Sequence, residues 1–152
     1  MLLILFQNFK KTNMKAEELK IGNYVKIDEG IGKVAFIMDK NFCNEYANDD
    51  YNITVEMGDG IFREEEEDKV EGIPLTEEIL LNCGFEYINT NNKVCGLISP
   101  ENGNGDRYRI VHFLDGDFRM VLNTWRYVSI KNVHQLQNLY YAINGKELNI
   151  QL

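Results

Sequence analysis

The stretch VHQLQNLYYAINGKEL, residues 133–148, is the most strongly patterned part of this chain of 152 residues. Its apolar residues recur at the spacing of one face of an α-helix, and they are Val133, Leu136, Leu139, Tyr140 and Ile143. Asn132 is a suitable N-cap and Asn144-Gly145 a suitable stop. Because a single helix cannot bury its own apolar face, we expect this face to pack on a sheet.

The opposite side of the same predicted helix is polar but nearly without charge. His134, Gln137, Asn138 and Tyr141 follow at i, i+3, i+4 and i+7, so they form one row, which we call the polar stripe. Amide and tyrosine side chains hydrogen-bond at interfaces with a smaller desolvation cost than charged groups. Two interpretations remain open: the polar stripe faces outward as a partner-binding site, or it is buried against the N-terminal strands. We adopt the first as the working hypothesis.

Most of the remaining chain predicts antiparallel β-structure. Alternating or β-branched segments bounded by turn residues predict strands, at residues 24–27, 33–39, 51–57, 85–90, 93–98, 107–123 and 125–130. The segment PLTEEILLNCGF predicts a short helix with Thr76 as its N-cap and Gly84 as its stop. The final ELNIQL alternates like a closing strand. The expected fold class is therefore α+β, with antiparallel sheets and two short helices packed on the sheet.

The clearest hairpin is RYRIVHFLDGDFRMVLN, residues 107–123. Asp115-Gly116 predicts a two-residue turn, which pairs His112 with Arg119 and Val111 with Met120. One face of this hairpin is then expected in the core, with Val111, Phe113, Phe118, Met120 and Leu122. The other face is expected to carry Tyr108, Ile110, His112, Arg119 and Val121.

That second face is a candidate site for nucleic acid or a nucleotide. Tyr108, His112, Arg119 and Arg126, which we call the arginine face, combine cations with rings that could stack on bases. However, residues 93–131 contain six basic and four acidic residues, a net charge of only +2 that attracts phosphate weakly. Nucleic-acid binding is therefore kept as the alternative to protein binding.

The negative charge is concentrated in one region of the chain. The net charge is −8, yet residues 45–71 alone hold eleven acidic and two basic residues. Its densest part, the acidic segment, consists of Glu64, Glu65, Glu66, Glu67 and Asp68. Successive side chains of an extended segment alternate in direction, so these carboxylates do not converge on a metal ion. The favoured interpretation is a solvated charged loop or strand edge that discourages association between sheets. The alternative is a surface that binds a basic partner or imitates the phosphates of nucleic acid.

The sequence predicts neither catalysis nor a cofactor. His112 and His134 accompany no recognisable nucleophile motif. Cys43, Cys83 and Cys95 are widely spaced, so neither a disulfide framework nor a zinc site is indicated, and reduced structural thiols are expected. The loop ENGNGD lacks the lysine of a phosphate-binding loop. We therefore expect a protein that is not an enzyme and holds no cofactor or metal.

Domain organisation is indicated by changes along the chain. Residues 1–13 look unlike the rest of the sequence, and Met14-Lys15 opens a well-formed segment, so 1–13 is predicted to be an appended extension. Its apolar run MLLILF is too short for a signal peptide or a membrane span, which predicts a cytoplasmic protein without membrane contact. Residues 14–152 predict one compact α+β domain, with a β-rich part at 14–72 and an α+β part at 73–152.

Two resemblances extend these predictions. ELKIGNYVKIDEGIGKVAFIMD has a glycine turn between two short strands and resembles the start of small SH3-like barrels, which implies an SH3-like N-terminal half. MKAEELKIGNYV, GIPLTEEILLNCGFE and VHQLQNLYYAINGKEL together resemble a family of small uncharacterised proteins of gut Bacteroidales genomes and their phages and prophages. The second resemblance implies an accessory protein of a mobile element, with a host or phage protein as partner. It carries over no functional residues and leaves homo-oligomers open.

Overall fold

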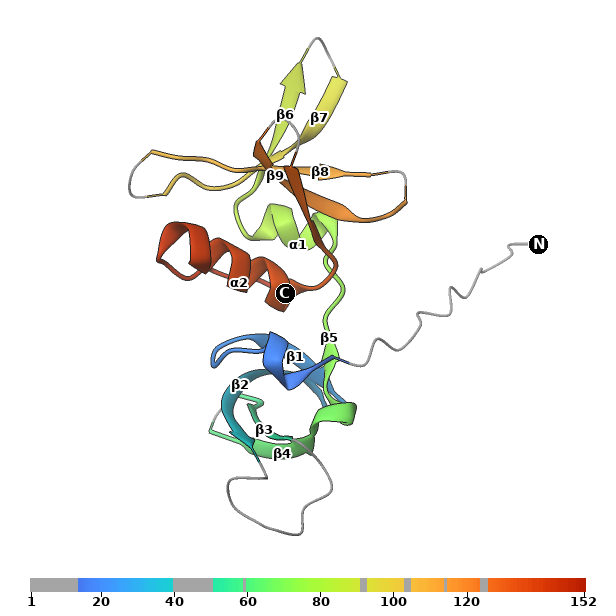
Figure 1. Ribbon diagram of the computed structural model, residues 1–152, viewed down its shortest axis with the longest axis vertical. Helices are drawn as coiled ribbons and strands as arrows, with labels where there is room; N and C mark the ends of the chain where they lie inside the picture. The colour runs from blue at the N-terminus through green and yellow to red at the C-terminus, as the bar shows by residue number, and fades with distance from the viewer. Residues whose placement is uncertain are drawn as a thin grey trace, which may run out of the picture. The chain divides into compact units, whose positions relative to one another are not determined.

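The computed structural model describes residues 14–39, 51–58, 60–90, 93–102, 105–113, 115–123 and 126–152, without the side chains of 51, 89, 90 and 93–95. The predicted extension 1–13, Cys43 and the acidic residues between 45 and 50 lie outside that part. The fold is α+β, with two antiparallel sheets and two α-helices among the described residues (Figure 1). The chain divides into two compact units, Met1–Ile21 with Val25–Gly72, and Gly22–Tyr24 with Ile73–Leu152.

The first unit contains a sheet with the strand order β4-β3-β2-β1-β5. Its strands are β1 (Tyr24–Ile27), β2 (Gly30–Asp39), β3 (Tyr51–Glu56), β4 (Phe62–Glu66) and β5 (Glu71–Gly72). Short 3₁₀ helices lie before β1 (η1, Ala16–Glu18) and between β4 and β5 (η3, Glu67–Lys69). β5 returns to pair antiparallel with β1, with Val25 opposite Gly72. The sheet curls strongly, so that its strands run around a ring in Figure 1.

The inside of this curled sheet is a small hydrophobic core. Val25, Ile27, Val34, Ile53 and Val55 are almost fully buried there. Ile53 and Val55 alternate with the half-buried Asn52 and Thr54, as expected for a strand with one face in the core. Gly32 lets β2 approach β3 closely, because a Cβ at this position would lie 2.5 Å from the side chain of Val55.

The second unit contains a sheet with the strand order β10-β9-β8-β7-β6. Its strands are β6 (Glu86–Thr90), β7 (Lys93–Ile98), β8 (Arg109–His112), β9 (Phe118–Asn123) and β10 (Arg126–Ile130). The helices are α1 (Glu77–Asn82), before β6, and α2 (Val133–Asn144), after β10. Both helices lie on the same side of this sheet (Figure 1).

The ends of both helices are set by the local groups that the sequence predicts. At α1, Ile79 N donates to Thr76 Oγ1 over 3.2 Å, and Gly84 takes a left-handed conformation with φ of +86°. At α2, Asn132 and Gln135 form a capping box, and Gly145 ends the helix in the left-handed region. These contacts satisfy backbone groups that a helix end leaves without partners.

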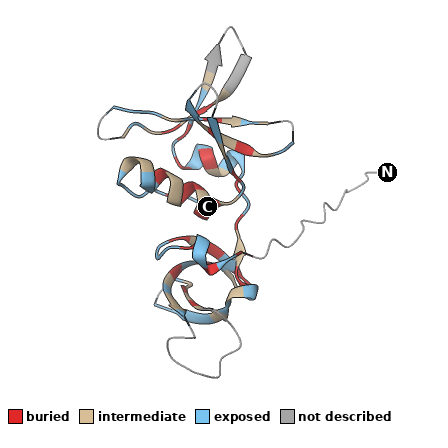
Figure 2. Cartoon of the chain, viewed as in Figure 1, coloured by how far each residue is buried: buried red, intermediate tan, exposed pale blue. Residues whose placement is uncertain are grey.

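The core of the second unit lies between this sheet and the two helices. Leu97, Ile110 and Met120 sit opposite one another on β7, β8 and β9, and they are buried together with Leu80 and Leu136 of the helices. Figure 2 shows the buried residues of both helices. The strand predicted for ELNIQL is wrong, because no strand forms there. Its Leu148 and Ile150 are nevertheless buried in this core.

The predicted register of the 107–123 hairpin is wrong by one residue. Phe113 N donates to Asp117 O over 2.9 Å, so three residues rather than two separate the ends of the turn. Gly116 is its left-handed residue, with φ of +88°, as in three-residue hairpin loops. His112 therefore lies opposite Phe118, and Val111 lies opposite Arg119. A slip of one residue moves every side chain of a strand to the other face, so Ile110 takes the core position expected for Val111.

Replacing Ile110 and Val111 one at a time by Ala tests this register. We expect Ile110→Ala to lower the free energy of unfolding by about 2–4 kcal/mol, because it leaves a cavity in the core. We expect Val111→Ala, at a half-buried position on the other face, to cost less than about 1 kcal/mol. Urea unfolding followed by circular dichroism measures both changes. The opposite order of the two losses would support the two-residue turn.

Candidate functional site

The polar stripe does not face outward as a whole. His134 has no exposed surface and Gln137 is 4% exposed, whereas Asn138 is intermediate and Tyr141 is exposed. The working hypothesis of an outward partner-binding stripe is therefore wrong for His134 and Gln137. The structure instead matches the other interpretation, in which the stripe is buried against an N-terminal segment.

That segment, residues 22–24, comprises the turn before β1 and the first residue of β1. Gln137 Oε1 accepts a hydrogen bond from Tyr24 N over 2.9 Å, and Gln137 Nε2 donates to Gly22 O over 3.1 Å. Asn23 Nδ2 donates to Asn138 Oδ1 over 3.0 Å. Both ends of the Gln137 amide are thus used inside the second unit, which is how a buried amide avoids a large desolvation cost.

The acidic segment lies along β4 and η3 of the first unit. Figure 2 shows mostly exposed residues along β4. The carboxylates of the acidic segment differ in the groups that they contact. Glu67 Oε1 accepts from the backbone N–H of Ala16 over 2.6 Å, so this residue holds η1. Glu66 lies 3.5 Å from Lys69 Nζ, and this carboxylate, more than any other group, raises the pKa of Lys69. Glu64 accepts from Asn52 Nδ2 over 2.9 Å.

Two exposed phenylalanines share the outer face of the first sheet with these carboxylates. Residues opposite each other on antiparallel strands project to the same side. Phe36, Thr54 and Glu64 lie opposite one another across β2, β3 and β4, and Glu56 lies opposite Phe62. Phe36 and Phe62 are each 54% exposed. We call the set Phe36, Thr54, Phe62, Glu64 and Glu66 the outer face of the first sheet.

The sequence pattern did not identify Phe36 as a surface residue. Val34 and Phe36 are two positions apart on β2 and would share a face in a regular strand. The register between β2 and β3 shifts between these residues, so that Val34 is buried while Phe36 is exposed. Such a bulge leaves no reliable trace in an apolar segment such as VAFIM.

The arginine face is divided between the two sides of the second sheet. His112 lies opposite Phe118 and stacks on its ring, with 4.5 Å between the ring centroids, on the side that bears the core. Arg119 lies opposite Val111 on the other side. Tyr108 is half-buried against the core, and Arg126 is exposed next to a register shift. These residues therefore do not form the single surface that the sequence predicted.

A different cluster forms on the side of the sheet away from the helices. The guanidinium of Arg119 lies 4.1 Å from the ring centroid of Phe113, and Phe113 meets Tyr127 edge-to-face at 5.8 Å. The predicted two-residue turn had placed Phe113 in the core. The Leu-Asp-Gly order, with glycine in the third position of a three-residue loop, is the signal that could have corrected this.

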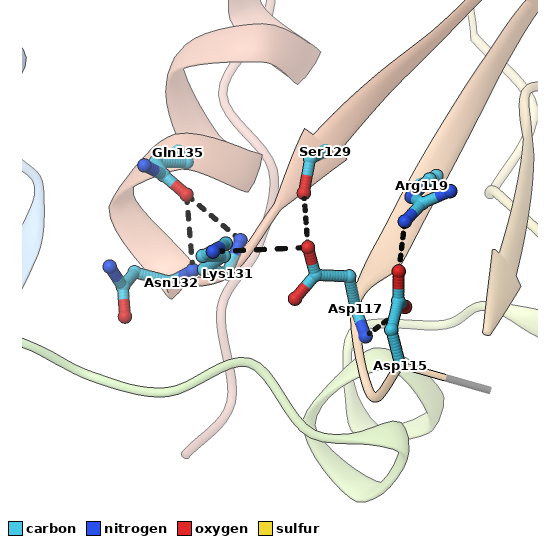
Figure 3. A network of polar contacts seen from close by, with 7 residues as sticks. All are labelled: Asp115, Asp117, Arg119, Ser129, Lys131, Asn132 and Gln135. Carbon is cyan, nitrogen blue, oxygen red and sulfur yellow. Dashed lines mark hydrogen bonds and ion pairs between the residues drawn. The ribbon is translucent and has the colours of Figure 1, made fainter. Parts of the chain in front are cut away.

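Arg119 and Lys131 are paired with acids of the 107–123 hairpin (Figure 3). Arg119 pairs with Asp115, and Lys131 Nζ lies 3.9 Å from Asp117. Ser129 also donates to Asp117 over 3.0 Å, and Arg107 pairs with Glu86 over 3.2 Å. These pairs reduce the positive potential that a nucleic-acid phosphate would meet.

The described residues offer little for metal or thiol chemistry. No group of three or more His, Cys, Asp or Glu among them is arranged to hold a metal ion. Cys83 is a buried free thiol, and burial raises its pKa, which lowers the fraction of reactive thiolate. In the same part of the chain, no helix has the length and apolar character needed to cross a membrane.

Comparisons with known proteins give no further guide to this site. No protein-family model, curated protein or solved structure matches the chain.

Replacement of Gln137 tests the structural role of the polar stripe. We expect Gln137→Ala to lower the free energy of unfolding by about 2–3 kcal/mol, because Tyr24 N and Gly22 O lose their partner. Tyr141→Ala, at the exposed end of the stripe, should cost less than about 1 kcal/mol. Thermal and urea unfolding measure both effects. Equal, small losses at the two positions would contradict the burial of Gln137.

Proposed function

We propose that the protein is a non-enzymatic interaction factor of a phage or mobile element, acting in the bacterial cytoplasm, and that it binds a basic protein partner. The contact is made by the outer face of the first sheet. The observation that carries this proposal is the presence of two exposed phenylalanines, Phe36 and Phe62, beside Glu64 and Glu66 on one face. The setting rests on the resemblance of three sequence motifs to proteins of phages and prophages.

The distribution of charge supports a basic partner. The first unit has sixteen acidic and nine basic residues, a net charge of −7, whereas the second has eight and seven, a net charge of −1. A concentrated negative field speeds the encounter with a basic protein. Exposed carboxylates alone contribute little affinity, because water and salt screen them.

The exposed aromatic residues supply the binding affinity that exposed carboxylates alone do not. Burying the ring of a phenylalanine removes apolar surface from water, at about 25 cal/mol for each Å². Interfaces commonly have such a ring at the centre and polar groups at the rim. Phe36 and Phe62, with carboxylates on neighbouring positions, fit this arrangement. A surface that only imitated nucleic-acid phosphates would not need them, so a basic protein is preferred over an acidic decoy.

The topology of the first unit is compatible with this role. Four consecutive strands, a 3₁₀ helix before β5 and the pairing of β5 with β1 support assigning it to the SH3-like barrels. Small barrels of this kind commonly present one curved face to a partner. The assignment of fold type is a part of the proposal, and binding is argued from Phe36, Phe62 and the carboxylates themselves.

Nucleic-acid or nucleotide binding at the second sheet is the second candidate. The observation in its favour is the cluster of Phe113, Arg119 and Tyr127 on the side away from the helices. The exposed Arg109 lies on the same side, opposite Val121. The ion pairs of Arg119 and Arg107 with carboxylates weaken this candidate relative to the first.

Capture of partners from a bacterial lysate, after nuclease treatment, tests the two candidates. We expect Glu64→Gln, Glu65→Gln and Glu66→Gln together to reduce recovery of basic proteins at least about tenfold, because the carboxylates attract them. Phe36→Ser with Phe62→Ser should reduce it similarly. Glu67 is left in place because it holds Ala16.

The matched control carries Arg109→Gln and Arg126→Gln on the second sheet, and it should recover the same proteins as the unchanged chain. Circular dichroism establishes that each variant is folded. Full recovery by the triple glutamine variant would contradict the proposed function. Loss confined to the arginine variant, in a parallel capture from lysate without nuclease treatment, would support nucleic-acid binding. Recovery that needs the carboxylates but not the phenylalanines, and that DNA competes away, would support an acidic decoy.

A further inference from the structure

We propose, resting on the proposed function above, that the basic partner binds as an extended segment that adds a strand to the open edge of β4. β4 is the last strand in the order of the first sheet and pairs with β3 on one side. Among the described residues, no strand pairs with its other side. An edge of this kind can accept a further strand through main-chain hydrogen bonds.

The hydrogen-bonding pattern tells which backbone groups face that edge. Along an antiparallel pair, opposite residues alternate between hydrogen-bonded and non-hydrogen-bonded pairs. Met57 N donates to Ile61 O over 2.8 Å, and counting in steps of two makes Val55–Arg63 and Ile53–Glu65 the hydrogen-bonded pairs of β3 and β4. The backbone N–H and C=O groups of Phe62, Glu64 and Glu66 therefore point away from β3.

A side-chain contact agrees with this assignment. The guanidinium of Arg63 donates to Phe62 O over 3.2 Å. This carbonyl could not easily accept from Arg63 if it were engaged with β3. The residues whose backbone faces the edge are also the three of β4 whose side chains lie on the outer face, opposite Glu56, Thr54 and Asn52.

The side chains along the edge of β4 determine which kind of segment would pair with it. On an added strand, residues opposite Glu64 and Glu66 would have their Cβ atoms roughly 5 Å from the glutamates, so Lys or Arg is favoured there and Asp or Glu is disfavoured. The glutamates also disfavour pairing of β4 with the β4 of a second copy, since like charges would lie opposite each other. The occupant is thus an extended segment with alternate basic residues.

The first experiment measures amide hydrogen exchange by NMR on the full chain. The probe is an eight-residue peptide of alternating Lys and Val, with blocked ends. In the chain alone, the amides of Arg63 and Glu65 should be protected by β3, whereas those of Glu64 and Glu66 should exchange at least about tenfold faster. Adding the peptide should slow exchange at Glu64 and Glu66 at least tenfold. Unchanged exchange there at saturating peptide, or protection confined to other residues, would overturn the proposal.

The control peptide has the same side chains and a methyl group on every backbone nitrogen. It keeps the charge but cannot donate main-chain hydrogen bonds, so we expect it to bind at least about tenfold more weakly. Equal binding of the two peptides, weakened alike by the triple glutamine variant, would overturn strand addition while leaving the proposed function standing. Binding of neither peptide, with basic proteins still captured from lysate, would overturn strand addition in the same way.

Two substitutions of Glu64 separate the contribution of its carboxylate to binding from that of its backbone N–H. Glu64→Gln removes the carboxylate and keeps the N–H, whereas Glu64→Pro removes both. Proline is tolerated on an edge strand where the N–H faces outward, so Glu64→Pro should stay folded. It should weaken peptide binding further than Glu64→Gln does. Equal affinity of the two folded variants would overturn the proposal, and if Glu64→Pro does not fold, the exchange measurement on the unchanged chain decides.

Discussion

The pairing of residues across antiparallel strands decides which surfaces this protein presents. Residues that lie opposite each other share a face, so the register selects the buried set and the exposed set together. On the second sheet it places Ile110 and Met120 in the core and leaves Arg119 with Val111 on the other side. On the first sheet it brings Phe36 next to Thr54 and Glu64. Every candidate surface depends on this constraint.

Both faces of the helix α2 contact other parts of the second unit. Its apolar side packs on the core of the second unit through Leu136 and Tyr140. Its polar side bonds the segment 22–24 through Gln137 and Asn138. Polar residues without charge suit this position, because a buried amide needs partners for one acceptor and one donor group, whereas a buried charge costs far more. The near absence of charge on that side is thus explained by burial rather than by docking.

The concentration of acids on β4 affects which strands can pair with its open edge. Charged side chains on an edge strand disfavour pairing with an identical edge. The same carboxylates favour a basic segment at this edge. They therefore both oppose pairing with the β4 of a second copy and favour a basic partner. Glu67 departs from this pattern, since its carboxylate binds the backbone of Ala16. Exposed Phe36 and Phe62 would give the selected segment apolar contacts that salt does not screen.

The sequence by itself determined the features that arise within a few residues of each other. Thr76 and Asn132 cap their helices, Gly84 and Gly145 end them, and alternation predicts the strands, because these depend on local backbone geometry and local hydrogen bonds. The tertiary structure alone decided the hairpin register, the bulge between Val34 and Phe36, and the partner of Gln137. These depend on contacts between distant segments, where a turn longer by one residue exchanges the faces of a whole strand.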